Sequence, residues 1–323
     1  MKDSVCNLII DSCSELPREL CEAEGLTVLS FTYTEGNPEL ADTPQGLTGV
    51  DDMFQSISAH DFYENMRQGA MPMTSQPSQL VFEDAFRAAL DTGRDTVYLA
   101  FSSGLSGCYE GACMAADRIA EERGAASPQD LGLYIVDLKL GSAPEGLLVA
   151  EAIRQRNNGL TASELAAWAE EARYYVHTLF MVDDLTALKR GGRIPASIAL
   201  AGTKLDVKPL LTFDIEGRLS MVGVVRGRKK GLRRMAEFYE KGHNDDMYSA
   251  IAAVGAADAD EDADRLCELI AKSTRTSLFL RTHVGPTIGC HVGPGMICLS
   301  FWGEDRRQQT SISDRIAGKV RGR

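Results

Sequence analysis

Residues 96–107 read TVYLAFSSGLSG and place a short apolar strand directly before a serine- and glycine-rich turn and the start of a helix. Two further apolar runs end in a similar way, since residues 5–10 stop at Asp11 and residues 133–136 stop at Asp137. Short apolar strands that alternate with helices predict a parallel sheet covered by helices. Polar side chains at the carboxyl ends of such strands mark the edge of the sheet where ligands bind.

The rest of the first half continues this alternation. A helix starts at Pro17, and a polar stretch rich in Gly, Pro and Thr predicts a loop over 34–50. Hydrophobic periodicity predicts a second strand at 26–33 and helices at 60–68, 81–90 and 145–156.

The second half differs because hairpins interrupt the alternation. Residues 206–213 and 219–225 predict one hairpin, and further strands are expected at 177–182, 248–254, 278–280 and 296–301. Gly159-Leu160-Thr161 marks a boundary between the halves. We therefore expect a two-domain α/β protein. Residues 1–160 form an N-terminal domain with a mostly parallel sheet and helices on both faces, and residues 161–323 form a C-terminal α/β domain with a mixed sheet.

The composition argues against several classes of protein. The 34 Lys and Arg residues against 46 Asp and Glu residues give a net charge of −12, which argues against a general nucleic-acid binder and a constitutive binder of anionic membranes. No apolar run approaches the roughly 18 residues of a membrane-spanning helix, and the start of the chain lacks a signal-peptide core. The eight cysteines are scattered without a C-x-x-C pair, so we expect reduced thiols, a cytoplasmic protein and no metal site.

The serine-rich turn is the first candidate for a binding site. Residues 102–107 combine small side chains, which let a ligand approach the backbone, with the free N–H groups of a helix N-terminus. A carboxylate or phosphate group fits such a position, with Ser106 or Ser103 as the hydroxyl donor. The alternative is that these serines only cap the helix.

Three further motifs carry polar side chains that are candidates for the same site. Residues 74–78 (TSQPS) form a hydroxyl-rich loop before a helix, and the loop either converges on the same anion through Thr74 or serves only as a cap. His291 precedes a rigid V-G-P-G turn, although a single histidine is more often structural than functional. Arg193 follows two glycines in a turn and either reaches the neighbouring site or stays in solvent.

A run of positive charge stands out in this acidic chain. Six basic side chains fall within nine residues: Arg226, Arg228, Lys229, Lys230, Arg233 and Arg234. The run is either the solvated start of a helix or a docking surface for an acidic partner or a phosphorylated substrate.

Five of these segments, in this order, resemble those of the DegV family of bacterial fatty-acid-binding proteins. They are residues 10–12 (IDS), 74–78 (TSQPS), 102–107 (SSGLSG), 188–194 (LKRGGRI) and 291–295 (HVGPG). The resemblance implies a two-domain α/β protein with one long-chain fatty acid in an apolar tunnel between the domains.

The resemblance also implies roles for particular residues. Thr74 and His291 are expected to hold the carboxylate of the fatty acid together with Ser106, with Ser103 as the alternative serine. Arg193 is expected to support the site.

The resemblance further implies a partner. Family members of this kind present the fatty acid to a fatty acid kinase, which makes acyl-phosphate for phospholipid synthesis. The basic run with Arg226 and Arg228 matches the segment implied in kinase docking, and membrane contact is expected to be transient only.

The chain departs from the family pattern at three positions in or beside these motifs. Cys108 and Val292 stand where the family usually has threonine, and Leu138 stands where it usually has serine. These differences concern the headgroup contacts and the acyl preference more than the fold.

The sequence lacks the parts needed for phosphoryl transfer, since it has neither a G-x-x-x-x-G-K-[S/T] loop nor carboxylates placed for magnesium. We therefore predict a carrier with a bound fatty acid and no cofactor, rather than an enzyme. The alternative is a serine hydrolase acting on acyl esters, with Ser106 as nucleophile, His291 as base and Asp137 or Asp183 as third member. However, residues 104–108 read GLSGC, with the second glycine one position early for G-x-S-x-G. A third possibility is a sensor of small anions or phosphate.

Overall fold

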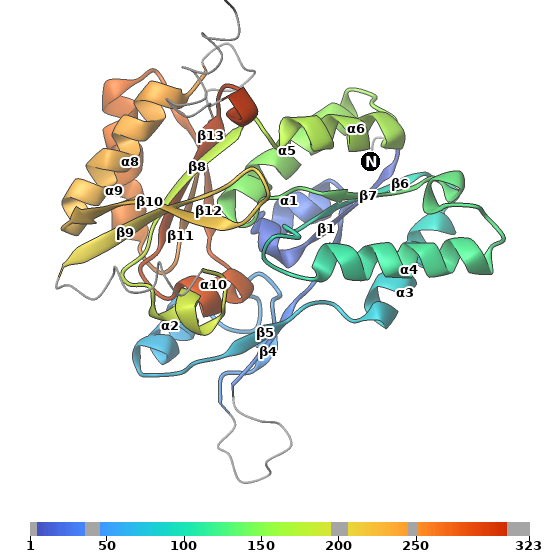
Figure 1. The fold of residues 1–323 in the computed structure, drawn as a ribbon, viewed down its shortest axis with the longest axis horizontal. Helices are drawn as coiled ribbons and strands as arrows, with labels where there is room; N and C mark the ends of the chain where they lie inside the picture. The colour runs from blue at the N-terminus through green and yellow to red at the C-terminus, as the bar shows by residue number, and fades with distance from the viewer. Residues whose placement is uncertain (1–4, 36–45, 195–205, 245–250, 309–323) are drawn as a thin grey trace, which may run out of the picture.

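The computed structural model describes residues 5–35, 46–194, 206–244 and 251–308. Within these ranges the strands form three sheets, of four, six and three strands (Figure 1). No helix in the same ranges is both long and apolar enough to cross a membrane.

The four-stranded sheet is parallel and has the order β2-β1-β6-β7. Its strands are β1 (Asn7–Asp11), β2 (Thr27–Leu29), β6 (Thr96–Ala100) and β7 (Leu133–Asp137). Alternate side chains of these strands enter two different clusters of the core, because successive residues of a strand point to opposite faces. Helices α3 (Gln79–Leu90) and α4 (Cys108–Glu122) cover one face, and α5 (Ala143–Asn157) and α6 (Ala162–Ala172) cover the other. The prediction of a parallel sheet with helices on both faces is confirmed.

The six-stranded sheet is mixed and has the order β10-β9-β8-β13-β11-β12. Only β11 and β12 are parallel neighbours; the other pairs are antiparallel. Its strands are β8 (Val176–Met181), β9 (Val207–Phe213), β10 (Leu219–Arg226), β11 (Ile251–Ala256), β12 (Leu278–His283) and β13 (Ile297–Trp302). Helices α8 (Arg228–Gly242) and α9 (Asp260–Ser273) pack on one face. The predicted mixed sheet is confirmed, and residues 248–250 of the predicted strand 248–254 lie outside the described residues.

The small third sheet corrects two expectations. Residues 26–33 were expected to form one strand, but they form β2 and then β3 (Thr32–Thr34), which belong to different sheets. The chain changes direction at Phe31, whose backbone N–H donates to the Ser12 hydroxyl while its side chain is buried. β3 pairs with β4 (Gly49–Val50), inside the expected loop 34–50, and with β5 (Met73–Ser75).

The remaining helices are short. They are α1 (Arg18–Ala23), α2 (Ala59–Arg67), α7 (Thr186–Arg190), α10 (Pro286–Val292), and the 3-10 turns Ser12–Ser14, Pro128–Leu131 and Arg306–Gln308. His291 lies in the last turn of α10, and the predicted turn follows it at residues 294–295. Helix α10 packs against β3, β5 and α7, so an element from the end of the chain meets strands from its beginning. The division into domains at residue 160 stays a prediction.

Candidate functional site

A cavity of about 370 Å³ lies where the parallel sheet, the six-stranded sheet and α10 meet. This volume falls within the range of roughly 300–1,000 Å³ that is common for small-molecule sites. One wall is apolar and comes from one face of the six-stranded sheet: Phe180 of β8, Phe213 of β9, Leu219 of β10 and Cys298 of β13. Register explains why these side chains share a wall, since Phe180 pairs with Cys298 and Phe213 pairs with Leu219.

Four of the residues singled out from the sequence line this cavity: Thr74, Ser106, Arg193 and His291. They come from separate elements, and the fold brings them together. Thr74 Oγ1 lies 2.8 Å from His291 Nε2, which joins β5 to α10 across 217 positions of sequence. Arg193 Nε donates to the backbone carbonyl of Leu105 at 3.2 Å, directly before Ser106. The cavity therefore combines an apolar wall with a cluster of hydroxyl, imidazole and guanidinium groups.

The serines after β6 have three different partners. Ser102 Oγ donates to the Gly217 carbonyl at 2.8 Å, and Ser103 Oγ donates to Asp137 Oδ2 at 2.6 Å. Ser106 alone of the three lines the cavity, and its Oγ accepts from the Cys108 N–H of the first α4 residue at 3.2 Å. Ser106 is therefore the serine placed to contact a ligand, and Ser103 lies outside the cavity lining.

The serine-rich turn also packs directly against the turn between β9 and β10. A Cβ added at Gly104 would lie 2.7 Å from the carbonyl carbon and oxygen of Gly217, so only glycine fits at this contact. Gly217 itself has a φ of +77°, a left-handed conformation that glycine adopts at little cost. The backbones of the serine-rich turn and of the β9–β10 turn thus meet beside the cavity, with no side chain between them.

Burial controls the charge of His291. Desolvation, together with the positive charges of Arg193 and Arg190, lowers the pKa of His291 to about 4. The imidazole is therefore neutral at pH 7. Its Nδ1 has no hydrogen-bond partner among the described residues, and it faces Gly191, where an added Cβ would come within 3.0 Å of it. The second glycine of the G-G-R motif has another role, since Gly192 has a φ of +70°.

Arg193 supplies the positive charge at this site. Burial lowers the pKa of its guanidinium group, which nevertheless stays protonated at pH 7. The guanidinium donates to the backbone carbonyls of Leu105 and Gly191, and the described residues give it no carboxylate partner. A half-buried cation with only neutral partners favours an anion at this end of the cavity.

The hydrogen bonds do not assemble the Ser–His–Asp chain of a hydrolase. His291 Nε2 contacts Thr74 instead of Ser106. Asp137 accepts hydrogen bonds from the Ser103 hydroxyl and backbone N–H, and Asp183 pairs with Lys208 and Arg228. Neither carboxylate contacts the imidazole.

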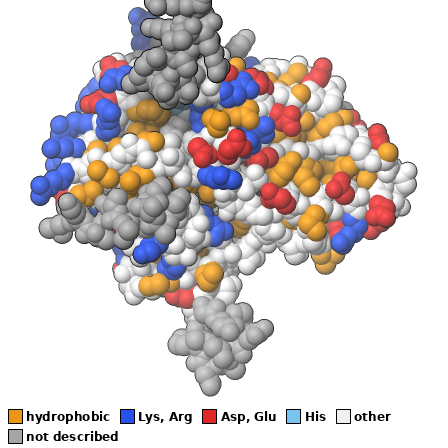
Figure 2. All heavy atoms as spheres, in the orientation of Figure 1, with side chains coloured by type: hydrophobic (Ala, Val, Ile, Leu, Met, Phe, Trp, Pro, Cys, Tyr) orange, Lys and Arg blue, Asp and Glu red, His pale blue; other side chains and the backbone are white. Residues whose placement is uncertain are grey.

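The basic run contains one partly buried arginine with two carboxylate partners, Arg228, and five exposed cations, of which Arg234 pairs with Glu237. Arg228 lies at the start of α8, pairs with Asp183 and Asp262, and donates to the carbonyl of Gly295. The other five basic side chains are exposed. Figure 2 shows Lys and Arg side chains gathered at the left edge of this face, where Figure 1 draws α8 and α9.

Two polar residues of the cavity wall were missed in the sequence analysis. Ser142 donates to Glu15 Oε2 at 2.6 Å, and the Thr287 hydroxyl donates to Asp51. The Pro286 that begins α10 is the signal that could have placed Thr287 on a helix. Ser142 adopts a φ of +63°, which no local sequence feature indicates.

Comparisons with known proteins identify relatives along nearly the whole chain. A family model described as "Uncharacterised protein, DegV family COG1307" matches residues 6–304. A DegV domain-containing protein of Clostridium perfringens is 30% identical over 299 residues, which cover 93% of this chain and 98% of the relative. One from Lactococcus lactis is 31% identical over 292 residues, covering 90% of this chain and 96% of the relative.

Solved structures share the fold. A DegV family protein from Thermus thermophilus, described by its fatty acid binding, superposes with a TM-score of 0.76 at 27% identity and covers 93% of this chain and 99% of its own. A stearic acid-binding protein from Eubacterium ventriosum has the same TM-score at 22% identity, covering 91% and 97%. The second likeness concerns the fold alone.

Proposed function

Because this chain belongs to the DegV family, we propose that it binds one long-chain fatty acid in the cavity between residues 1–160 and 161–323. The observation that carries this proposal is a single cavity with an apolar wall and a cluster made by Thr74, Ser106, Arg193 and His291. A fatty acid needs these two opposite environments in one place. The fatty acid binding of the Thermus thermophilus relative supports the assignment.

The apolar wall supplies most of the affinity. Burying about 14 methylenes at roughly 0.8 kcal/mol each contributes on the order of 11 kcal/mol. The loss of translational freedom and the ordering of the chain reduce this figure.

The polar cluster satisfies the carboxylate. If Nε2 carries the ring hydrogen of the neutral His291, it donates to Thr74 and leaves the Thr74 hydroxyl hydrogen free for the ligand. The Ser106 hydroxyl offers a second neutral donor, and Arg193 adds positive charge. We propose that this arrangement holds the anion without a direct buried salt bridge, so that a carboxylate oxygen remains able to accept a phosphoryl group from a partner.

We further propose that the protein is a carrier rather than an enzyme and that its partner is a fatty acid kinase, with phospholipid synthesis as the destination of the acyl group. The exposed cations at Arg226, Lys229, Lys230 and Arg233 offer the kinase a basic docking surface on a chain of net charge −12. Arg228 would hold the start of α8 in place beneath these cations through its ion pairs with Asp183 and Asp262. A cytoplasmic location is proposed as well, supported by eight cysteines that are all free thiols.

The first experiment identifies the ligand. Native mass spectrometry and solvent extraction of the purified protein are expected to give a bound long-chain fatty acid. The double variant Thr74→Ala/Ser106→Ala should purify without it, whereas Ser103→Ala should retain it because the Ser103 hydroxyl binds Asp137 outside the cavity. Normal lipid content in the double variant would overturn the assignment.

A second experiment separates a carrier from a hydrolase. A serine-directed fluorophosphonate should leave the wild-type protein unlabelled, because no described base contacts Ser106. Covalent labelling that the variant Ser106→Ala abolishes would instead support the hydrolase.

A third experiment tests the partner. Charge reversal at Lys229, Lys230 and Arg233 should weaken binding to a fatty acid kinase and leave fatty acid binding unchanged. Reversal of Lys272 on the neighbouring helix α9 is the matched control. Equal kinase binding by both variants would remove the basic surface from the proposal.

A further inference from the structure

The N-terminal end of α10 is attached to two buried carboxyl groups. Glu15 Oε1 accepts from the backbone N–H of Gly285 at 3.0 Å. Asp51 Oδ2 accepts from the backbone N–H of Thr287 at 3.0 Å and also from the Thr287 hydroxyl. Three donors at the start of one seven-residue helix are thus taken up by two side chains.

Both carboxyl groups come from the first 51 residues, far along the chain from α10. Glu15 is 6% exposed and Asp51 is 1% exposed, so water does not compete for these hydrogen bonds. Tyr63 adds a third attachment from the same part of the chain, because its hydroxyl donates to the Val284 carbonyl at 2.5 Å. The position of α10 is therefore fixed by residues from the N-terminal part of the chain.

Backbone strain gathers around the same two carboxyl groups. Glu15 has a φ of +54°, and its partner Ser142 has a φ of +63°. Met53 and Phe54, directly beyond Asp51, have φ values of +60° and +62°. Positive φ values are unfavourable for residues other than glycine and persist where the surroundings require them. Such clustering is typical of segments that hold a functional group in place.

Helix α10 connects these attachments to the polar cluster of the cavity. Its last turn carries His291, and Ile288 and Val292 line the cavity as well. Because the helix has only seven residues, a shift at Gly285 or Thr287 moves the imidazole.

We propose that Asp51 and Glu15 are positioning residues, which hold α10 so that His291 meets Thr74 and the carboxylate of the bound fatty acid. The identity of the ligand in this inference rests on the proposed function. The positioning of α10 rests on the hydrogen bonds of Asp51 and Glu15 alone. The two residues touch the helix and never the ligand.

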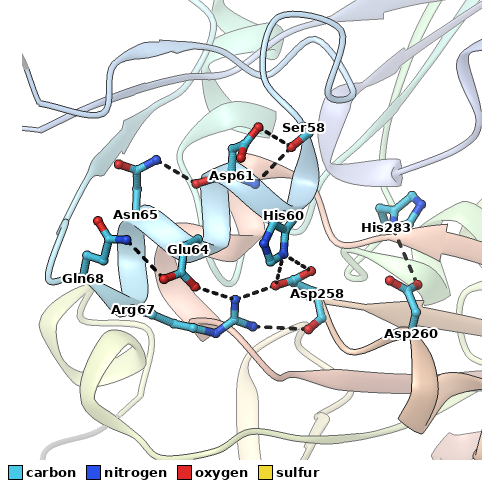
Figure 3. Close-up of polar contacts among 10 residues, drawn as sticks. All are labelled: Ser58, His60, Asp61, Glu64, Asn65, Arg67, Gln68, Asp258, Asp260 and His283. Carbon is cyan, nitrogen blue, oxygen red and sulfur yellow. Dashed lines mark hydrogen bonds and ion pairs between the residues drawn. The ribbon is translucent and has the colours of Figure 1, made fainter.

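The test compares Asp51→Ala and the isosteric Asp51→Asn with a control that also loosens a contact between distant segments. Figure 3 shows this control contact, in which Arg67 and His60 of α2 bind Asp258 in the loop after β11. Arg67→Ala removes the arginine part of this contact, and within the described residues Arg67 has no hydrogen bond or ion pair with α10. Each protein is titrated by NMR on its histidine side chains, and Kd is measured for oleate.

Asp51→Ala removes the acceptor for Thr287 and should let water reach the imidazole, so the pKa of His291 should rise from about 4 toward the usual 6.5. Asp51→Asn keeps an acceptor oxygen and should restore most of the wild-type value, and Arg67→Ala should leave the value unchanged. Affinity for oleate should fall roughly tenfold or more in Asp51→Ala, the scale of losing a hydrogen bond to a charged group, and by less in Asp51→Asn. Glu15→Gln keeps an acceptor for Gly285 and should behave almost as the wild type. An unchanged His291 titration in folded Asp51→Ala overturns the proposal. A wild-type protein that binds no fatty acid refutes the proposed function instead, and the titration still tests the positioning.

Discussion

Replacing Gly191 by alanine should weaken fatty acid binding while leaving the fold intact. Gly191 has the right-handed dihedral angles φ −70° and ψ −11°, so its backbone accepts alanine without strain. The added Cβ would lie less than 3.0 Å from His291 Nδ1, whereas ordinary van der Waals contact begins at 3.4 Å. Because the neighbour is a side chain that can rotate, the imidazole gives way and the helix does not.

The size of the effect follows from the contact that the imidazole leaves. A displacement on the order of 1 Å takes Nε2 beyond hydrogen-bond distance of Thr74 Oγ1, which it now meets at 2.8 Å. Losing this support for a charged ligand should cost about 2 kcal/mol. That energy corresponds to roughly a thirtyfold increase in Kd at 25 °C. Isothermal titration calorimetry with oleate measures the change directly.

Gly192→Ala is the matched control. Gly192 has a φ of +70°, so alanine there strains the backbone, but the added Cβ has no atom within 4 Å. We expect this variant to lose about 1 kcal/mol of unfolding free energy and to bind oleate as the wild type does. Urea denaturation gives the stability of both variants. Unchanged oleate affinity in Gly191→Ala, or equal losses of affinity in the two variants, would refute the role given to His291.

Three further outcomes are expected. The pKa of His291 is about 4 in the folded protein and about 6.5 in the unfolded chain. The wild type should therefore lose up to about 3 kcal/mol of stability relative to His291→Gln as pH falls from 6.5 to 4. Urea denaturation at both pH values measures this loss, and a constant difference in stability between the two proteins would contradict the prediction. Burial raises the pKa of Asp11 from 3.8 to about 6, so the wild type should lose about 3 kcal/mol of stability relative to Asp11→Asn as pH rises through that window. The same assay applies, and a constant difference between the two proteins would show that burial does not raise the pKa of Asp11. Phe213→Ala enlarges the apolar end of the cavity and should shift the binding preference from stearate toward docosanoate, at a stability cost of about 3–5 kcal/mol. Competition between the two acids measures their relative affinities, and an unchanged ratio of affinities would place Phe213 away from the acyl chain.

Periodicity was sufficient to predict the strands and helices that bury a continuous face. The short apolar runs at residues 5–10, 96–101 and 133–136 alternate with helices and predict parallel strands, and β1, β6 and β7 lie side by side in one parallel sheet. Short elements were harder to predict because they depend on distant partners. β3 and β4 have three and two residues, and they are strands only because they pair with neighbours: β3 with β4 and β5, and β4 with β3.

The candidate site was predictable to the level of motifs, and less so to the level of atoms. Spacing along the chain does not distinguish Ser103 from Ser106, because the difference is made by Asp137, which takes the first of these hydroxyls. The attachments of α10 were not predictable either. Glu15 and Asp51 look like ordinary surface acids in the sequence, and only the folded chain shows that both are buried.

The close approach of Gly104 to Gly217 bears on the kinetics of exchange. The two backbones approach there more closely than a Cβ would allow, next to Leu105 and Ser106 of the cavity lining, so no side chain lies between them that could rotate to admit an acyl chain. Passage at this point therefore requires whole backbone segments to separate, a slower event than rotation about a side-chain bond. We expect the residence time of a bound lipid to respond to the stiffness of these two loops more than to the width of the cavity beside them.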